Sequence, residues 1–336
     1  MLLKLFRSSR TLVIFVLPLI IIALWLPDFR DHFVQLFPFD LYAGPLYELV
    51  GSFSTRNILF SKITALLLYF LIAILLVRLN IKYFFIQSRT QLPAVIYLLI
   101  ISGIIIIQRF NPVILSSLLL IIATDRIFES FKFDGLAYHY FDAALLISLS
   151  SLIYINSFYF IAFLWVGLVL LRQFRWREWS FTIIGLILPY LFLYGYYLAT
   201  GKDIHEMLFK TIREYFSDGF AITYRVFQVK LFGYILLAYI LLASVFMMQL
   251  FDTKKTHSRK YFLFFLWMFI ISTLMFILIP SYGVEYLIIA AIPVSYLLSH
   301  YFAFSRLNWI NRIIFTVFLL IPFIVVYFDD FSVWFK

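Results

Sequence analysis

Cysteine and charge are both scarce in this sequence. Its 336 residues include no cysteine and only 13% charged side chains, against roughly 25% in an ordinary soluble domain. The lack of cysteine excludes disulfides, thiol catalysis and Cys-based metal sites. With 64% hydrophobic residues, the chain has too few polar groups to cover a water-exposed surface. The solvent for most of the chain is therefore expected to be lipid.

The motifs of soluble enzymes are also absent. The sequence contains no Walker loop and no GxGxxG, GxSxG or HExxH motif. Its five histidines are scattered along the chain and form no metal-ligand spacing. These motifs and the histidine spacing therefore predict neither a nucleotide-binding loop nor a histidine-based metal site.

Long apolar runs dominate what is present. The mean hydropathy is +1.00, and crossing a hydrocarbon layer of roughly 30 Å takes about 20 apolar residues. The sequence predicts an all-α polytopic integral membrane protein, one transmembrane domain over residues 1–336 with about eleven spans. The predicted spans are 11–27, 59–79, 93–109, 112–128, 138–155, 157–172, 180–199, 229–250, 261–280, 284–303 and 312–328.

The apolar run 143–171 is ambiguous. It could form one long helix or a hairpin broken at Ile155-Asn156-Ser157. A hairpin concentrates Lys and Arg on one side of the membrane, whereas a single helix spreads them almost evenly over both sides. The positive-inside rule therefore favours the hairpin. It also predicts a cytoplasmic N-terminus, a retained first span after the basic segment Met1–Arg10, and a periplasmic C-terminus.

The net charge of +10 follows from the same topology. Most bases fall in short loops between spans, so membrane orientation explains them without a nucleic-acid partner. The aromatic content of 21% fits lipid-facing Phe and interfacial belts of Tyr and Trp. The predicted partner is a lipid bilayer, and the predicted location is a bacterial inner membrane.

The central third of each predicted span lacks ionisable residues. Lys62, Asp142, Glu285 and His300 all lie close to a span end. Ion-coupled transporters normally need polar groups near the midplane of the membrane. This distribution disfavours a transporter and favours a functional site at a membrane face.

The predicted outer side holds most of the 17 acidic residues. In the first outer loop, residues 28–58, Asp28 and Asp31 are three apart, so a helical continuation of the first span places both on one side. Paired carboxylates can act as a general base or bind a divalent metal ion, and the alternative is that they are simply solvated. Asp28 and Asp31 are the candidate catalytic residues; the cofactor is unknown, and a divalent metal ion is one possibility.

The second outer loop, residues 200–228, contains an amphipathic pattern. Apolar residues recur at helical spacing from Ile204 to Phe216, and Asp203 with Glu206 resembles a capping box. Such a helix is expected to lie in the headgroup plane, either as a brace or as the wall of a groove for a lipid-linked substrate. The candidate phosphate-binding residues of this loop are Lys202, Lys210, Arg213 and Arg225.

The inner side carries charged pairs at helical spacing. Asp125, Arg126 and Glu129 precede one loop, and His139 and Asp142 follow it. These residues are predicted to form salt bridges that close a cytoplasmic loop.

Several segments are similar to one family of multi-spanning inner-membrane proteins from Bacteroidota. Arg175-Trp176-Arg177-Glu178-Trp179 is the most specific part of the likeness, which covers most of the chain. The resemblance implies a lineage and a compartment, since that family has no established activity. The segments that carry it are Phe141–Leu146, Ser151–Tyr154, Phe174–Trp179, Ile184-Gly185, Pro189-Tyr190, Glu285–Leu287, Pro293 and Ser299–Tyr301.

The predicted architecture also resembles that of C-type glycosyltransferases. The shared features are a cytoplasmic N-terminus, one span, an acidic outer loop, many further spans and a later amphipathic outer loop. Those enzymes take sugars from polyprenyl-phosphate donors and use an acidic residue of the first outer loop as a base or metal contact, a role that the resemblance assigns to Asp28 or Asp31. The chain departs from the pattern in its short first loop, in its non-adjacent acids and in lacking a large periplasmic domain.

Three functions remain open from the sequence. The first is transfer or polymerisation of polyprenyl-phosphate-linked sugars at the periplasmic face, motivated by outer acids and bases beside an interfacial helix. The second is a non-catalytic subunit or scaffold of an envelope or secretion assembly, motivated by the lack of catalytic motifs. The third is a lipid or solute transporter, which needs a polar cavity that sequence patterns do not reveal.

Overall fold

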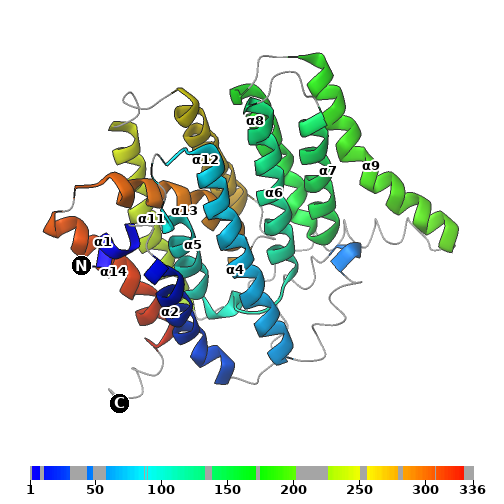
Figure 1. Ribbon diagram of the computed structural model, residues 1–336. Helices are drawn as coiled ribbons and strands as arrows, with labels where there is room; N and C mark the ends of the chain where they lie inside the picture. Colours follow the sequence, from blue (N-terminus) through cyan, green and yellow to red (C-terminus); the bar gives the residue numbers. More distant parts are fainter. Residues whose placement is uncertain are drawn as a thin grey trace.

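The computed structural model of the chain is built from α-helices and short 3₁₀ turns (Figure 1). It describes residues 2–7, 11–30, 44–47, 58–86, 88, 90–132, 138–171, 175–201, 226–249, 256–278, 283–306 and 308–328, and no strand occurs within these ranges. The all-α prediction is therefore confirmed for the described part of the chain.

The helices follow the predicted spans closely. Every predicted span coincides with helical structure, although three of them, 93–109, 157–172 and 284–303, divide into an α-helix and a 3₁₀ turn. The elements are α1 (Leu2–Arg7), α2 (Thr11–Arg30), α4 (Ile58–Tyr83), α5 (Leu92–Ser102), η2 (Ile105–Ile107), α6 (Pro112–Lys132), α7 (Tyr138–Ile153), η3 (Ile155–Phe160), α8 (Ile161–Leu171), α9 (Trp176–Thr200), α11 (Val226–Gln249), α12 (Thr256–Leu278), η4 (Val284–Tyr286), α13 (Leu287–Phe304) and α14 (Trp309–Val326).

Six helices within the described ranges are long and apolar enough to cross a membrane. They lie within α4, α9, α11, α12, η4–α13 and α14. Their burial differs widely. In the apolar stretch of Val284–Phe304, 83% of the residues are buried within the protein, whereas in that of Trp176–Thr200 only 17% are. Helix α13 is therefore a central helix of the bundle, and α9 is a peripheral one whose apolar side chains face the surroundings.

The two ends of α2 mark the two ends of the bundle. Helix α4 runs antiparallel to α2, since Lys62 near its start contacts Asp28 near the end of α2. At the far end of α4, Lys82 contacts Asp125 in the last turns of α6. We call the end of the bundle that contains Asp28 and Lys62 the Asp28 end. The opposite end contains Lys82, Asp125 and the start of α2, which follows Arg7, and we call it the Arg7 end.

The segment 143–171 forms a hairpin rather than one helix. Helix α7 ends at Ile153, and the 3₁₀ turn η3 contains the predicted break at Asn156 and Ser157. The chain then returns, because Gly167 of α8 lies against Ile127 in the second half of α6. Ser157 also hydrogen-bonds to Ser116 near the start of α6. Polar side chains in η3 therefore hold the turn in place at the Asp28 end.

Helices α7 and α9 pack closely at one point. A Cβ atom at Gly185 would lie only 2.6 Å from the main-chain oxygen of Phe141 and 2.9 Å from Cβ of Ala144. Small residues at such a crossing let two membrane helices approach closely. Figure 1 shows α9 leaning away from α7 beyond this point, toward the C-terminal end of α9.

Candidate functional site

Of the predicted site residues, the structure describes Asp28. Helix α2 continues through Arg30, so Asp28 lies on a helix, as the proposed continuation of the first span requires. Asp31 and the predicted amphipathic helix lie outside the described residues. The four predicted phosphate-binding residues also lie outside them: Lys202, Lys210, Arg213 and Arg225. Their convergence with Asp28 stays a prediction.

The Asp28 carboxylate forms an ion pair with Lys62. The Lys62 Nζ atom lies 3.0 Å from Asp28 Oδ2, and the side chains of Lys62 and Asp28 are only 7% and 13% exposed. Lys62 also donates a hydrogen bond to the main-chain oxygen of Asp28. A carboxylate held this way ties α2 to α4.

An apolar cleft of about 470 Å³ lies between α7 and the second half of α9. A volume of this size falls within the range of roughly 300–1,000 Å³ that is typical of ligand pockets. The residues that line the cleft come from α7, α9 and the segment at residues 44–47. They are Pro45, Leu46, Leu145, Leu149, Leu152, Leu188, Pro189, Phe192, Leu193, Tyr196 and Tyr197.

Hydrogen bonds join α7 to α9 on one side of the cleft, and the two helices are separated where the cleft lies. Ser148 donates a hydrogen bond to the main-chain oxygen of Leu186 at 2.8 Å, and the hydroxyls of Ser151 and Tyr190 lie 2.7 Å apart. The exposed face of α9 beyond these contacts is apolar and includes Leu191 and Phe192. The cleft is therefore continuous with the lipid-facing surface of the protein.

A chain of contacts connects the cleft to the Asp28–Lys62 pair. Ser61, next to Lys62, accepts a hydrogen bond from the main-chain N–H of Phe110 at 3.2 Å. The Phe110 ring stacks on Tyr47 with ring centres 5.8 Å apart. Tyr47 belongs to the short segment that begins at Gly44, whose N–H donates to the oxygen of Ile153. The ion pair and the cleft therefore lie at the same end of the bundle.

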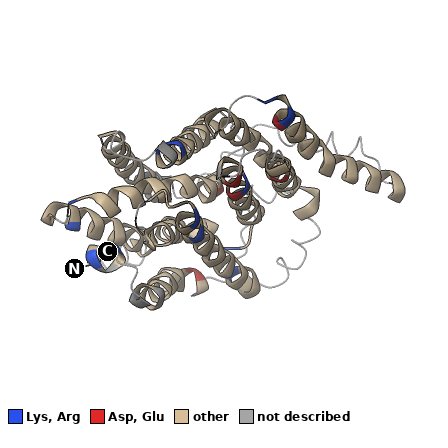
Figure 2. Cartoon of the chain, turned by 45° about the horizontal axis from the view of Figure 1, so that its top comes forward, with Lys and Arg blue, Asp and Glu red and all other residues tan. Residues whose placement is uncertain are grey.

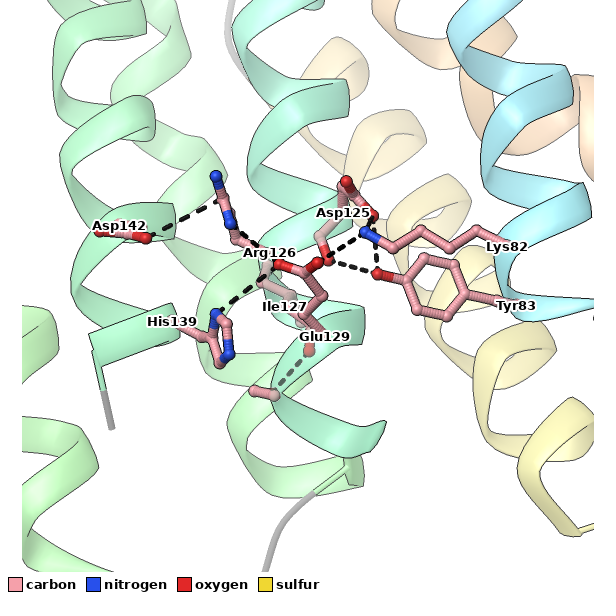
Figure 3. Close-up of polar contacts among 9 residues, drawn as sticks. Lys82, Tyr83, Asp125, Arg126, Ile127, Glu129, His139 and Asp142 are labelled. Carbon is pink, nitrogen blue, oxygen red and sulfur yellow. Dashed lines mark hydrogen bonds and ion pairs between the residues drawn. The ribbon is translucent and has the colours of Figure 1, made fainter. Parts of the chain in front are cut away.

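A separate network of charged side chains lies at the Arg7 end, across α4, α6 and α7 (Figure 3). Lys82 Nζ lies 2.7 Å from both Asp125 Oδ1 and Glu129 Oε1. Arg126 contacts Glu129 at 3.0 Å and Asp142 at 3.9 Å. The predicted salt bridge between Arg126 and Glu129 is confirmed, and the contact from Arg126 to Asp142 crosses the loop between α6 and α7. Sequence spacing missed Lys82, which lies on a different helix 43 residues before Asp125.

His139 and Tyr83 complete this network. His139 Nδ1 lies 3.7 Å from Glu129 Oε2, and the Tyr83 hydroxyl donates to Asp125 Oδ1 at 2.6 Å. Burial alone raises the pKa of the Glu129 carboxyl, which lies just beyond the predicted span 112–128. The hydrogen bonds and charges of Lys82 and Arg126 outweigh burial and lower this pKa below its ordinary value. The network therefore holds Glu129 ionised.

Metal ligands do not gather in the described ranges. Within them, no group of three or more His, Asp or Glu residues is placed to hold a metal ion. The Arg7-end network instead neutralises its acids with Lys82 and Arg126, which suits a structural tie between helices.

The fold and its apolar helices define an α-helical membrane protein. No protein-family model matches the chain, and no curated protein or solved structure is significantly similar to it. The likeness to a family of inner-membrane proteins stays a prediction from the sequence.

Proposed function

We propose that this protein acts on a lipid-linked substrate at the Asp28 end, as a transferase of sugars carried on polyprenyl phosphate. The observation that carries the proposal is the cleft between α7 and α9, which opens onto the lipid-facing surface. A substrate anchored in the bilayer can place its hydrocarbon chain there without leaving the apolar phase. Its phosphate then reaches the membrane face at which Asp28 and Lys62 lie.

The lining of the cleft suits an isoprenoid chain. Nearly all of the side chains that line it are hydrocarbon or proline, and two tyrosines stand near the end of α9. Burying methyl-rich chain segments against leucine and phenylalanine gains dispersion contacts, while tyrosine hydroxyls prefer the polar interface. The arrangement orients a lipid-linked substrate with its polar head toward the Asp28 end.

The proposed reaction uses Asp28 as a base. The substrate phosphate binds the Lys62 ammonium in place of Asp28, which frees the carboxylate. The acceptor hydroxyl oxygen then attacks the anomeric carbon of the donor sugar, and its proton passes to Asp28. The bond from the sugar to the phosphate oxygen breaks, and polyprenyl phosphate leaves with the electron pair.

The first test concerns binding in the cleft. A photoreactive isoprenyl phosphate is incubated with the full chain in membrane vesicles, and labelled peptides are mapped by mass spectrometry. We expect labelling on α7 and α9, and we expect Leu149→Trp, which fills the cleft, to reduce it strongly. Leu191→Trp is the matched control, because Leu191 is exposed on the lipid-facing side of the same region and does not line the cleft.

The second test concerns the chemical step. Asp28→Asn is expected to abolish transfer of a radiolabelled hexose from isoprenyl phosphate while binding of the photoreactive probe persists. Full transfer activity in Asp28→Asn would overturn the catalytic role of Asp28. Equal labelling in the two tryptophan variants would overturn the role of the cleft.

A second candidate function is a non-catalytic membrane subunit or scaffold. It is favoured by the ion pair that ties Asp28 to Lys62 and by the mutual pairing of the Arg7-end charges. Affinity capture in mild detergent tests this function. Recovery of a stoichiometric partner supports it, and recovery of the monomer alone contradicts it.

A further inference from the structure

The Arg7 end carries a basic surface that the proposed transferase does not use. Its members come from α1 and from the end of α13 and the start of α14, which are far from α1 in the sequence. They are Lys4, Arg7, Arg306 and Arg312. Figure 2 shows blue ribbon at α1 and at the α13–α14 end, close to the marked N-terminus. We refer to these four residues as the basic surface.

Two contacts bring the two halves of the basic surface together. Arg7 Nη1 donates a hydrogen bond to the main-chain oxygen of Ser305 at 3.2 Å. The rings of Phe6 and Phe315 lie 5.8 Å apart. Lys4 is three residues before Arg7 and shares its side of α1. The charges of α1 are therefore held beside the α13–α14 turn.

Hydrogen bonds connect the described residues on the two sides of this turn. Asn311 Nδ2 donates to the main-chain oxygen of Arg306 at 2.8 Å, and Tyr301 donates its hydroxyl proton to Asn311 Oδ1 at 2.9 Å. The main-chain N–H of Arg312 donates to the oxygen of Asn308. These hydrogen bonds connect Arg306 at the end of α13 to the first turn of α14, which carries Arg312.

The parts of the sequence that carry the basic surface contain no acidic residue that could neutralise it. No Asp or Glu occurs between Met1 and Pro27, or between Leu287 and Phe328. Lys82 and Arg126 at the same end differ, because both are paired with carboxylates. Arg312 also lies in the first turn of α14, where the helix dipole disfavours a cation. A bound anion would offset both effects.

Exposed apolar side chains adjoin the basic surface. Trp309 is 71% exposed, and Ile310 and Ile313 on the same helix are about half exposed. Tryptophan prefers the membrane interface, and the isoleucines suit the acyl region just beneath it. The ligand that matches both features has an anionic phosphate group and hydrocarbon chains.

We propose that the basic surface binds the phosphate headgroup of an anionic phospholipid, with Trp309 at the level of the headgroup. Arg306 and Arg312 supply charge-assisted hydrogen bonds to the phosphate oxygens. Lys4 and Arg7 add positive charge from α1. Such a lipid bridges α1, α13 and α14 at the end of the bundle opposite to the cleft.

The test compares lipids with the purified full chain in detergent. Phosphatidylglycerol, phosphatidylcholine with the same acyl chains, and inorganic phosphate are titrated separately, and bound lipid is counted by native mass spectrometry. We expect tighter binding of phosphatidylglycerol than of phosphatidylcholine. In Arg306→Gln/Arg312→Gln, loss of two surface cations should weaken phosphatidylglycerol binding roughly 10- to 30-fold.

Two further variants control for the loss of charge and for misfolding. Arg175→Gln/Arg177→Gln removes the same charge from exposed residues at the start of α9 and should bind phosphatidylglycerol like the wild type. Arg306→Lys/Arg312→Lys keeps the charge and should retain most binding even if the glutamine variant folds poorly. Equal loss in both glutamine variants, equal affinity for the two lipids, or competition by millimolar inorganic phosphate would overturn the proposal.

Discussion

Asp28 and Lys62 illustrate how one contact can be either structural or catalytic. Both side chains are largely buried and belong to helices that are adjacent in the bundle but separated by a long connection. Two carboxylates were conspicuous in the sequence, but nothing in their spacing indicated that a lysine 34 residues later is the partner of Asp28. Sequence patterns report neighbours on one helix, whereas this pair depends on how two helices dock.

Breaking the Asp28–Lys62 pair from one side should destabilise the protein. Asp28→Ala leaves a buried ammonium without its carboxylate, and we expect the free energy of unfolding to fall by roughly 2–4 kcal/mol. The double variant Asp28→Leu/Lys62→Met should recover most of this loss, because it removes both charges together. Unfolding in mixed micelles measures both effects. Additive losses in the double variant would contradict direct coupling of the two residues.

The lowered pKa of Glu129 gives a pH dependence with a definite sign. A carboxyl whose folded pKa lies below its unfolded value of about 4.3 stabilises the protein above that value, and the contribution is lost as pH falls through the folded pKa. We therefore expect stability to fall on acidification below about pH 4.3. In Glu129→Gln part of this fall should disappear, as measured by unfolding temperature against pH. An unchanged pH profile in Glu129→Gln would contradict this assignment.

At the scale of helices, the crossing of α7 and α9 determines whether the cleft exists. Gly185 allows close approach at one point, and the hydrogen bonds from Ser148 and Ser151 hold the helices together near it. Beyond the crossing, exposed apolar residues of α9 face the surroundings.

Glycine substitutions on α9 test this crossing. In Gly185→Ala the new methyl group meets main-chain atoms of α7, and we expect a loss of about 1–3 kcal/mol in the free energy of unfolding. Gly195→Ala is the matched control on the same helix, since nothing lies within 4 Å of a Cβ atom there. The control should be neutral or stabilised by about 0.5 kcal/mol. Similar losses in both variants would show that the crossing does not depend on Gly185.

The helices could be predicted from the sequence far better than the site. Hydropathy indicated a helix at every predicted span, six of which are long and apolar enough to cross a membrane, and the polar residues at Asn156 and Ser157 correctly indicated a break in the run 143–171. The cleft could not be predicted, because it results from the angle between α7 and α9 and not from a residue pattern. The contacts of Lys82 with Asp125 and Glu129 could not be predicted for a related reason, since hydropathy gives the length of a helix but not its neighbours.

The whole molecule has different chemistry at its two ends. The Asp28 end has an ion pair and an apolar cleft, and the Arg7 end has the charge network and the basic surface. This asymmetry is what the positive-inside rule requires if the Arg7 end faces the cytoplasm. The orientation remains a prediction that the proposed substrate site depends on, because lipid-linked sugars would have to reach the Asp28 end.

Single cysteines can test the orientation, because the native chain contains none. Thr200 and Asn308 are exposed residues at the ends of α9 and α14, at the Asp28 end and the Arg7 end respectively. A membrane-impermeant maleimide added to intact cells should label Thr200→Cys and leave Asn308→Cys unlabelled until the membrane is permeabilised, since the reagent reaches only the outer side. Labelling of Asn308→Cys alone in intact cells would reverse the orientation and place the cleft and Asp28 on the cytoplasmic side. Labelling of both would show that the two residues are not separated by the bilayer, contrary to the membrane-spanning arrangement.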